Sequence, residues 1–361
     1  MVGARPNFMK VAPIFREMLK HPEEFAQLLV HTGQHYDDNM SQVFFEDLAL
    51  PQPDIYLGIG SGSHAQQTAR IMVACESMLM KHKPDLVIVV GDVNSTLSCA
   101  LTAAKLGIQV AHVESGLRSF DRTMPEEINR MLTDHISDLL FTTEPSANEN
   151  LRREGIAEEK IHFVGNVMID TLVQLLPKAE GRWSANHSIS NYRSKTRNLR
   201  EYALVTLHRP SNVDKPQSLQ KIMRTLIDIA REVPVIFPVH PRTRKKMENT
   251  GENIENRSLI LIEPLGYLDF LALMSHATFV ITDSGGIQEE TTYLGVPCLT
   301  LRDSTERPIT ITKGTNELVS LDTVAFHTDK IMEGAWKVGT IPEMWDGRSA
   351  ERIVDILSRQ M

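Results

Sequence analysis

The chain has 361 residues, a formal net charge of −8 and three cysteines. This length exceeds the size at which one hydrophobic core usually keeps growing, so we expect two domains. The negative charge argues against a protein that binds nucleic-acid backbones, because such a protein needs a basic face. Cys75, Cys99 and Cys298 stand far apart without metal-ligand spacing, which favours a reduced compartment and no metal site. The sequence shows neither a signal peptide nor an apolar run of roughly 20 residues, so we expect a cytoplasmic protein without a membrane partner.

Short apolar runs alternate with longer segments of helical periodicity, which is typical of β-α-β units in parallel sheets. In the first half we predict strands at residues 27–31, 86–90, 109–113, 138–142 and 161–164, and helices at 8–20, 64–81, 95–106 and 126–137. The alternation begins again with strands at 203–207, 235–239, 258–262, 279–282 and 296–301. We therefore predict an α/β protein with two doubly wound, Rossmann-like domains that face a cleft.

The predicted N-terminal domain spans residues 1–166, the C-terminal domain spans 167–345, and a helix in 346–361 packs back on the N-terminal domain. Residues 178–200 hold six basic side chains and one acid, so we predict a surface connection rather than a nucleic-acid-binding tail. Residues 165–166 are a candidate hinge. Residues 1–7 resemble a strand end and a strand-to-helix turn, so we expect that the first strand is cut short by truncation or by a late start.

Three acidic residues stand where parallel sheets bind ligands, beyond the carboxyl ends of strands. Asp92 follows the strand at 86–90, and Glu114 follows the strand at 109–113. Neighbouring strands would place both at one crevice, where two carboxylates can divide proton removal and proton delivery. Glu126 begins the next helix and is expected to pair with Arg130 one turn later. The competing interpretations are a helix cap for Asp92 and an ordinary helix start for Glu126.

Residues 279–290 give the strongest local signal: a strand, a glycine-rich turn and the start of a helix. Backbone N–H groups and the helix dipole would converge at Ser284, Gly285 and Gly286, where a pyrophosphate fits. Glu290 lies further along the helix, where a carboxylate can accept hydrogen bonds from a ribose. The competing interpretation is an ordinary strand-to-helix turn.

Basic residues also follow predicted strands, which suggests that an anion is held at the sheet edge of an acidic protein. These candidates are His208, Arg209, His240 and Arg307, with Arg5 and Lys10 at the first turn. The sequence has no G-x-G-x-x-G after a strand, no Walker A loop and no G-x-S-x-G elbow, which argues against a dehydrogenase, a kinase and a serine hydrolase.

Seven motifs occur in a recognisable order along the chain. They are GARPN from Gly3, GDVNST from Gly91, HVESGLR from His112, PEEINR from Pro125, HRP from His208, TDSGGIQEE from Thr282 and RDSTERP from Arg302. Together they resemble the non-hydrolysing UDP-N-acetylglucosamine 2-epimerases, a family with the GT-B fold. The resemblance implies reversible conversion of UDP-N-acetylglucosamine to UDP-N-acetylmannosamine for cell-surface polysaccharides. The implied route is elimination of UDP to a glycal and re-addition on the opposite face, without a cofactor.

The motif positions imply roles for individual residues. The implied catalytic residues are Asp92, Glu114, Glu126 and His208. With the strand-end residues above, the predicted substrate-binding set is Arg5, Lys10, Arg130, Arg209, His240, Ser284, Gly285, Gly286, Glu290 and Arg307. The expected partner is a UDP-sugar, and we expect a homodimer that binds no nucleic acid. Which acid acts as base in each half-reaction stays open.

Some motifs depart from the family pattern. Members activated by a second substrate molecule carry Q-x-x-Q, R-Q and H-R-R-E, whereas this chain has QHYD at 34–37, QQ at 66–67 and HRPS at 208–211. These differences leave allosteric activation open. With the segment 120–123, they also leave room for a related UDP-diacetamido-uronic acid as substrate. A GT-B glycosyltransferase, a hydrolysing epimerase and a non-catalytic sugar-nucleotide sensor stay open as competing functions.

Overall fold

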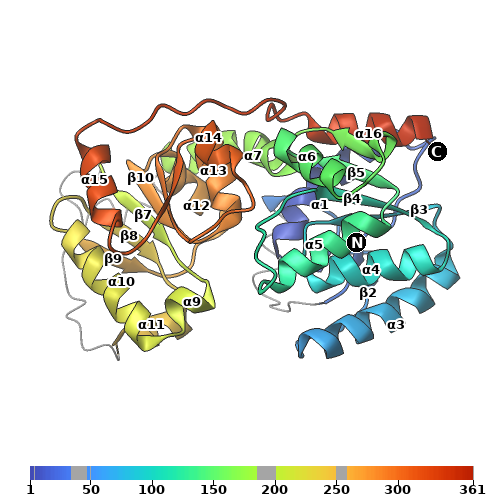
Figure 1. Cartoon of the computed structure of the whole chain (residues 1–361), viewed down its shortest axis with the longest axis horizontal. Helices are drawn as coiled ribbons and strands as arrows, with labels where there is room; N and C mark the ends of the chain where they lie inside the picture. Colours follow the sequence, from blue (N-terminus) through green and yellow to red (C-terminus); the bar gives the residue numbers. More distant parts are fainter. Residues whose placement is uncertain (4, 34–46, 49, 185–200, 249–257, 361) are drawn as a thin grey trace. The chain divides into compact units, whose positions relative to one another are not determined.

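The computed structural model describes residues 1–3, 5–33, 47–48, 50–184, 201–248 and 258–360 (Figure 1). The chain divides into two compact units, and the segment that follows the second unit belongs to the first. The first unit comprises Met1–Gln174 and Glu343–Met361, and the second comprises Leu175–Pro342. The predicted α/β class is confirmed, because both units are built on parallel sheets with helical connections.

The first unit contains a four-stranded parallel sheet in the order β3-β4-β5-β6. These strands are β3 (Leu86–Val90), β4 (Gln109–Ser115), β5 (Leu139–Thr142) and β6 (Ile161–Phe163). A separate parallel pair is formed by β1 (Val30–His31) and β2 (Ile55–Tyr56). Val2 forms a single parallel bridge with His31, and the Met1 ammonium donates a 2.9 Å hydrogen bond to the carbonyl of Ile88.

The helices of the first unit cover the strands and supply its core. They are α1 (Arg5–Met18), α3 (His64–His82), α4 (Asn94–Lys105), α5 (Pro125–Ile136), α6 (Pro145–Arg153), the start of α7 (Val167–Ser184) and α16 (Ser349–Gln360), with a 3-10 turn at Glu158–Lys160. Ser63 and Gln66 form a reciprocal capping box that begins α3. Buried residues of α3 and α4, such as Ile71 and Cys99, pack with Val89 of β3 into one core.

The end of the chain is tied to the first unit by a buried carboxylate. Asp170 of α7 accepts hydrogen bonds from the backbone N–H groups of Ser349 at 3.1 Å and Ala350 at 2.7 Å. These donors lie at the start of α16, where helix N–H groups have no partner within the helix. The side chain of Trp345 is buried just before α16 and donates to the carbonyl of Thr143 at 2.9 Å.

The second unit has a six-stranded parallel sheet in the order β12-β11-β10-β7-β8-β9. Its strands are β7 (Ala203–Thr206), β8 (Val235–Pro238), β9 (Leu259–Ile262), β10 (Phe279–Thr282), β11 (Cys298–Leu301) and β12 (Asn316–Val319). Its helices are the end of α7, α9 (Pro210–Val213), α10 (Pro216–Ile229), α11 (Pro241–Glu248), α12 (Tyr267–Ser275), α13 (Gly285–Leu294), α14 (Ile309–Thr312) and α15 (Val324–Met332). Counted in chain order, the strands run 3-2-1-4-5-6, which is the Rossmann arrangement. The order reverses between β7 and β10, and ligands bind at that point in such sheets.

Several predicted elements need correction. The strand predicted at 27–31 is only two residues long, and β2 and β12 were not predicted. Residues 178–184, predicted as part of a surface connection, continue α7, because their apolar positions keep the helical spacing past Pro177. The rest of that prediction, residues 185–200, and the QHYD segment at 34–37 lie outside the described residues. None of the helices in the described part of the chain has the length and apolar character needed to cross a membrane.

Candidate active site

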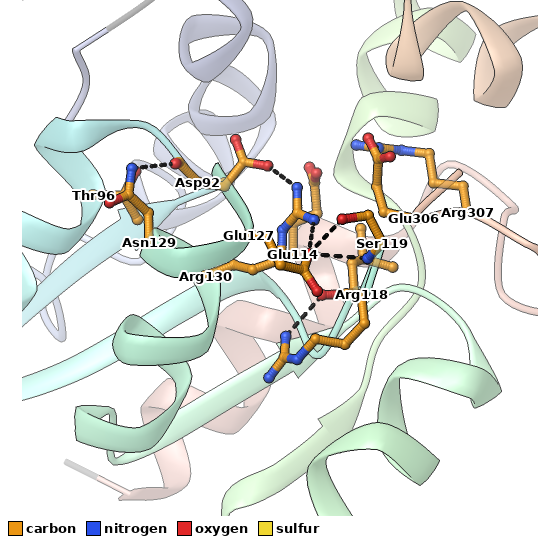
Figure 2. A network of polar contacts seen from close by, with 12 residues as sticks. Asp92, Thr96, Glu114, Arg118, Ser119, Glu127, Asn129, Arg130, Glu306 and Arg307 are labelled. Atoms are coloured by element: carbon orange, nitrogen blue, oxygen red, sulfur yellow. Dashed lines mark hydrogen bonds and ion pairs between the residues drawn. The ribbon is translucent and has the colours of Figure 1, made fainter. Parts of the chain in front are cut away.

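Asp92 lies in the short turn that joins β3 to α4. Gly91 takes a left-handed φ of +66°, which turns the chain sharply at the end of the strand. The cap position of α4 is Val93, and no side chain caps the helix there, so the capping interpretation of Asp92 is wrong. Instead, the Asp92 carboxylate pairs with Arg130 of α5, and the amide of Asn129 donates to the Asp92 carbonyl at 2.9 Å (Figure 2).

Glu114 lies at an irregularity near the end of β4. The register of β4 against β5 shifts between Val113 and Ser115, and Glu114 between them has φ +69°. A left-handed conformation costs a side chain of this kind roughly 1–2 kcal/mol. The Glu114 side chain is buried and forms an ion pair with Lys10 of α1, which is also buried. Backbone strain that the surrounding structure maintains is typical of functional sites.

The start of α5 presents two neighbouring acids with different surroundings. Glu126 is half-buried, and no polar contact is seen for it among the described residues. Glu127 is buried and accepts hydrogen bonds from the N–H and hydroxyl of Ser119 and from the N–H of Phe120, each at 2.9 Å. Arg130 pairs with Glu127 at 2.5 Å, so the predicted Glu126–Arg130 pair is wrong. Ser119 and Phe120 lie in the loop before α5 and donate hydrogen bonds to Glu127. These donors hold Glu127, and not Glu126, beside Arg130.

The switch point of the second unit is organised by Asp283, which follows β10 and is fully buried. Its carboxylate accepts hydrogen bonds from the backbone N–H of His208 at 3.1 Å, from that of Arg209 at 2.9 Å and from the amide of Asn212 at 2.9 Å. Burial raises the pKa of Asp283, but these donors and the His208 ring outweigh it, so the pKa lies below its usual value. Asp283 was missing from the predicted site residues, although its place directly after a strand of the switch point was a usable signal.

His208 stands at the surface of the second unit with a fixed ring. Its side chain is 64% exposed, and Nδ1 lies 2.9 Å from Oδ1 of Asp283. A carboxylate that holds one ring nitrogen orients the other, so Nε2 of His208 is directed by Asp283. Arg209 is held as well, since its Nε donates to the carbonyl of Asp283 at 3.0 Å.

The N-terminus of α13 has the features of an anion site. Ser284 occupies the cap position without a side-chain hydrogen bond to the helix, and Ser284, Gly285 and Gly286 are partly exposed. A Cβ atom at Gly285 would lie 2.7 Å from Nη1 of Arg307, so glycine is needed for the guanidinium to approach the helix start. Arg307 is itself fixed by ion pairs with Glu306 and, at 2.7 Å, with Glu289. Helix N–H groups and a nearby guanidinium together bind phosphate oxygens well.

Glu290 lies on the buried side of α13. The residue is 2% exposed, and its carboxylate accepts a 2.7 Å hydrogen bond from the hydroxyl of Tyr267. Burial raises the pKa of Glu290 to about 7, against the opposing effect of Tyr267, and the neighbouring Glu289 adds to the rise. The carboxyl therefore changes its charge near neutral pH.

The predicted site residues thus fall into two groups, one in each unit. The first unit brings together Lys10, Asp92, Glu114 and Arg130 around the ends of β3 and β4, with Glu126 at the start of α5. The second unit brings His208, Arg209, Ser284, Gly285, Gly286, Glu290 and Arg307 to the ends of β7, β10 and β11. His240 follows β8 and is exposed, and the side chain of Arg5 lies outside the described residues. No cluster of metal-binding side chains is found among the described residues.

A family model described as UDP-N-acetylglucosamine 2-epimerase matches residues 17–358. The chain belongs to this family. A curated UDP-N-acetylglucosamine 2-epimerase of Methanococcus maripaludis is 45% identical over 367 residues, which cover 99% of this chain and 97% of the relative.

Two further members of this 2-epimerase family are similar to the chain over most of its length. The crystal structure of the Methanocaldococcus jannaschii UDP-GlcNAc 2-epimerase, in complex with UDP-GlcNAc and UDP, is 44% identical. It has a TM-score of 0.87, and the match covers 99% of this chain and 98% of that one. A UDP-2,3-diacetamido-2,3-dideoxy-D-glucuronate 2-epimerase of Pseudomonas aeruginosa is 42% identical over 322 residues, covering 88% of this chain and 87% of the relative.

Proposed function

We propose that this chain catalyses the reversible epimerisation of UDP-N-acetylglucosamine at C2, which gives UDP-N-acetylmannosamine for cell-surface polysaccharides. The observation that carries the proposal is family membership across residues 17–358, combined with two carboxylates held at the ends of adjacent strands. The reaction needs a group that removes the C2 proton and a group that returns one to the opposite face. It also needs stabilisation of the UDP that leaves and returns.

Asp92 and Glu114 are the proposed proton-transfer groups. Asp92 follows β3 and Glu114 lies near the end of β4, and these two strands pair in parallel with Val90 opposite Val113. Each has a cation beside it, Arg130 for Asp92 and Lys10 for Glu114. A neighbouring cation stabilises the negative charge that a carboxylate base carries. One carboxylate takes the C2 proton while the C1–O bond to UDP breaks, and a double bond forms between C1 and C2. Proton delivery to the other face and re-formation of the C1–O bond complete the change.

The second unit supplies the proposed diphosphate site. The N–H groups at the start of α13 and the guanidinium of Arg307 can stabilise the charge that develops on the departing diphosphate. His208 is fixed through Nδ1 by Asp283, and in the protonated ring Nε2 can donate to a phosphate oxygen. The full predicted set is part of the proposal, with Glu126 as a third acid and Arg5, Arg209, His240, Ser284, Gly285, Gly286 and Glu290 as substrate contacts.

The predicted domain limits and assembly are also proposals. Residues 1–166 would carry the catalytic acids, residues 167–345 would bind UDP, and the helix in 346–361 would complete the first domain. The homodimer is tested by sedimentation of the purified protein, and the cytoplasmic location by fractionation of the source cells. Nucleic-acid binding is tested by the same sedimentation with added DNA.

Proton NMR of the purified protein in heavy water tests the activity. With UDP-N-acetylglucosamine alone, we expect UDP-N-acetylmannosamine to form and deuterium to enter C2 of both sugars. Free N-acetylmannosamine with UDP would indicate a hydrolysing enzyme, and consumption only after an acceptor is added would indicate a transferase. A parallel reaction with the UDP-diacetamido-uronic acid decides between the two substrates.

Asp92→Asn is the variant that separates catalysis from binding. We expect kcat to fall by about 100-fold or more, because general base catalysis by this group is lost. UDP binding, measured by calorimetry, should be retained. The matched control is Glu149→Gln, which removes a carboxylate that pairs with Arg153 on the surface of α6 and should leave kcat unchanged. Unchanged turnover in Asp92→Asn would contradict the assignment.

A further inference from the structure

We infer that Asp134 and His112 form a buried positioning pair that sets the turns carrying Asp92 and Glu114 relative to each other. The inference rests on the proposed function, because it concerns the two carboxylates assigned there. Asp134 and His112 are both fully buried. Their effect on the reaction would therefore be indirect, through the backbone of the two turns.

His112 links α5 to the turn before Asp92. It lies in β4, and its Nε2 is 2.8 Å from the carbonyl oxygen of Gly91. A carbonyl oxygen can only accept, so Nε2 is the donor in this hydrogen bond. The other ring nitrogen, Nδ1, lies 2.6 Å from Oδ1 of Asp134. The ring thus connects a helix carboxylate to the peptide group that immediately precedes Asp92.

The second oxygen of Asp134 holds the turn after Glu114. Oδ2 accepts a 3.1 Å hydrogen bond from the N–H of Gly116 and lies 2.7 Å from Nη1 of Arg118. Gly116 has φ +77°, and a Cβ atom there would lie 2.6 Å from the carbonyl oxygen of Ala147. The turn after Glu114 therefore cannot shift easily. Its position depends on that of the Asp134 carboxylate, which binds the N–H of Gly116.

Helix α5 is the common frame for both turns. Arg130, one turn before Asp134 on the same helix, holds the Asp92 side chain by an ion pair. Asp134 holds the Asp92 backbone through His112 and the Glu114 turn through Gly116. Burial raises the pKa of Asp134, but His112 and Arg118 outweigh it, and the pKa lies below its usual value. A charged, fully buried network adds little to the free energy of unfolding compared with apolar side chains of the same size. Its contribution here is to fix the geometry of the two turns.

Two substitutions at His112 separate its two hydrogen bonds. In His112→Asn the shorter amide can donate toward Asp134 but does not reach the carbonyl of Gly91. In His112→Gln the longer side chain can donate toward Gly91 but no longer contacts Oδ1 of Asp134. We expect kcat to fall about 10- to 100-fold in His112→Asn, since misplacing a catalytic group by about 1 Å has effects of this size. We expect a smaller loss in His112→Gln, with KM and UDP affinity within about threefold of the original protein.

The control is Ser137→Ala at the end of the same helix. Ser137 is buried and donates a 2.7 Å hydrogen bond to the carbonyl of Thr133, but it contacts neither turn. Its removal should lower thermal stability without changing kcat. A double variant, His112→Asn with Asp134→Asn, should have the kcat of the slower single variant, because residues that act as one unit are not additive.

The outcomes distinguish this inference from the proposed function. If the original protein shows no deuterium exchange at C2, the proposed function fails. If it is active and the His112→Asn variant binds UDP with kcat within threefold of the original, the positioning role is overturned. If His112→Asn does not fold, judged by circular dichroism and UDP binding, the decision rests on His112→Gln. Reduced kcat with retained UDP binding in that variant supports the role.

Discussion

Replacing Glu290 with glutamine should stabilise the second unit increasingly as the pH rises from 4.5 to about 7. The buried carboxyl of Glu290 has a pKa of about 7, raised from 4.5 mainly by burial. The folded state therefore holds this proton more tightly than the unfolded state. The resulting stabilisation is complete below pH 4.5 and is lost as the pH rises through 7. Glutamine has the same shape, keeps an acceptor for the hydroxyl of Tyr267 and does not ionise.

The size of the effect follows from the shift in pKa. A rise from 4.5 to about 7 corresponds to about 3 kcal/mol in the free energy of unfolding. The Glu290→Gln variant should exceed the original protein by up to this amount at pH 8, and the two should match below pH 4.5. For a unit of this length, about 3 kcal/mol raises the melting temperature by roughly 6–12 °C.

Scanning calorimetry of the ligand-free protein at pH 4, 5, 6, 7 and 8 measures the difference. Hydrogen exchange of the first unit at the same pH values is an internal control, because Glu290 belongs to the second unit. Glu289→Gln is the matched neighbour and should destabilise at every pH, since Glu289 forms a buried 2.7 Å ion pair with Arg307. A Glu290→Gln variant that is less stable than the original at pH 8, or shifted equally at all pH values, would refute the reasoning.

Three further predictions concern single side chains. Tyr267→Phe removes a hydroxyl that lowers the pKa of Glu290, so the loss of stability with rising pH should extend to higher pH in the same calorimetric series. Gly91→Ala should destabilise by about 1–2 kcal/mol and reduce kcat, because Gly91 has φ +66° and a Cβ would lie 3.1 Å from Nζ of Lys10. Gly107→Ala, with φ +72° and open space, should show the stability loss without the loss of kcat, and equal kcat values in the two variants would contradict this. Asp170→Ala removes the acceptor for the first N–H groups of α16 and should cost about 1–2 kcal/mol, seen as faster hydrogen exchange at the start of that helix.

The strands of the sheets could be predicted where burial on both faces leaves an uninterrupted apolar run. Leu86–Val90 and Phe279–Thr282 have the bounds expected from the sequence. The edge strand β12 was missed, because Asn316–Val319 includes two polar residues and pairs on one side only. Apolar runs in the sequence therefore predict the central strands of a sheet well and its edge strands poorly.

The places of Asp92 and Glu114 at strand ends could be predicted, but their contacts could not. Helical spacing allows Arg130 to reach either Glu126 or Glu127. The choice depends on Ser119, which lies in a loop whose path has no periodic signal. Similarly, nothing in the local pattern at Glu114 indicates its left-handed backbone, because that conformation is imposed by tertiary contacts.

The backbone at Glu114 also bears on how this protein would respond to selection for heat resistance. Glycine and asparagine adopt a φ of +69° at a lower energetic cost than glutamate does. Glu114 is nevertheless needed as the counter-charge of the buried Lys10 amine. A paired change, with glycine at position 114 and an apolar residue at position 10, would remove both the torsional strain and the buried charges. Libraries sorted only for survival at high temperature should therefore accumulate this pair among clones that no longer turn over substrate.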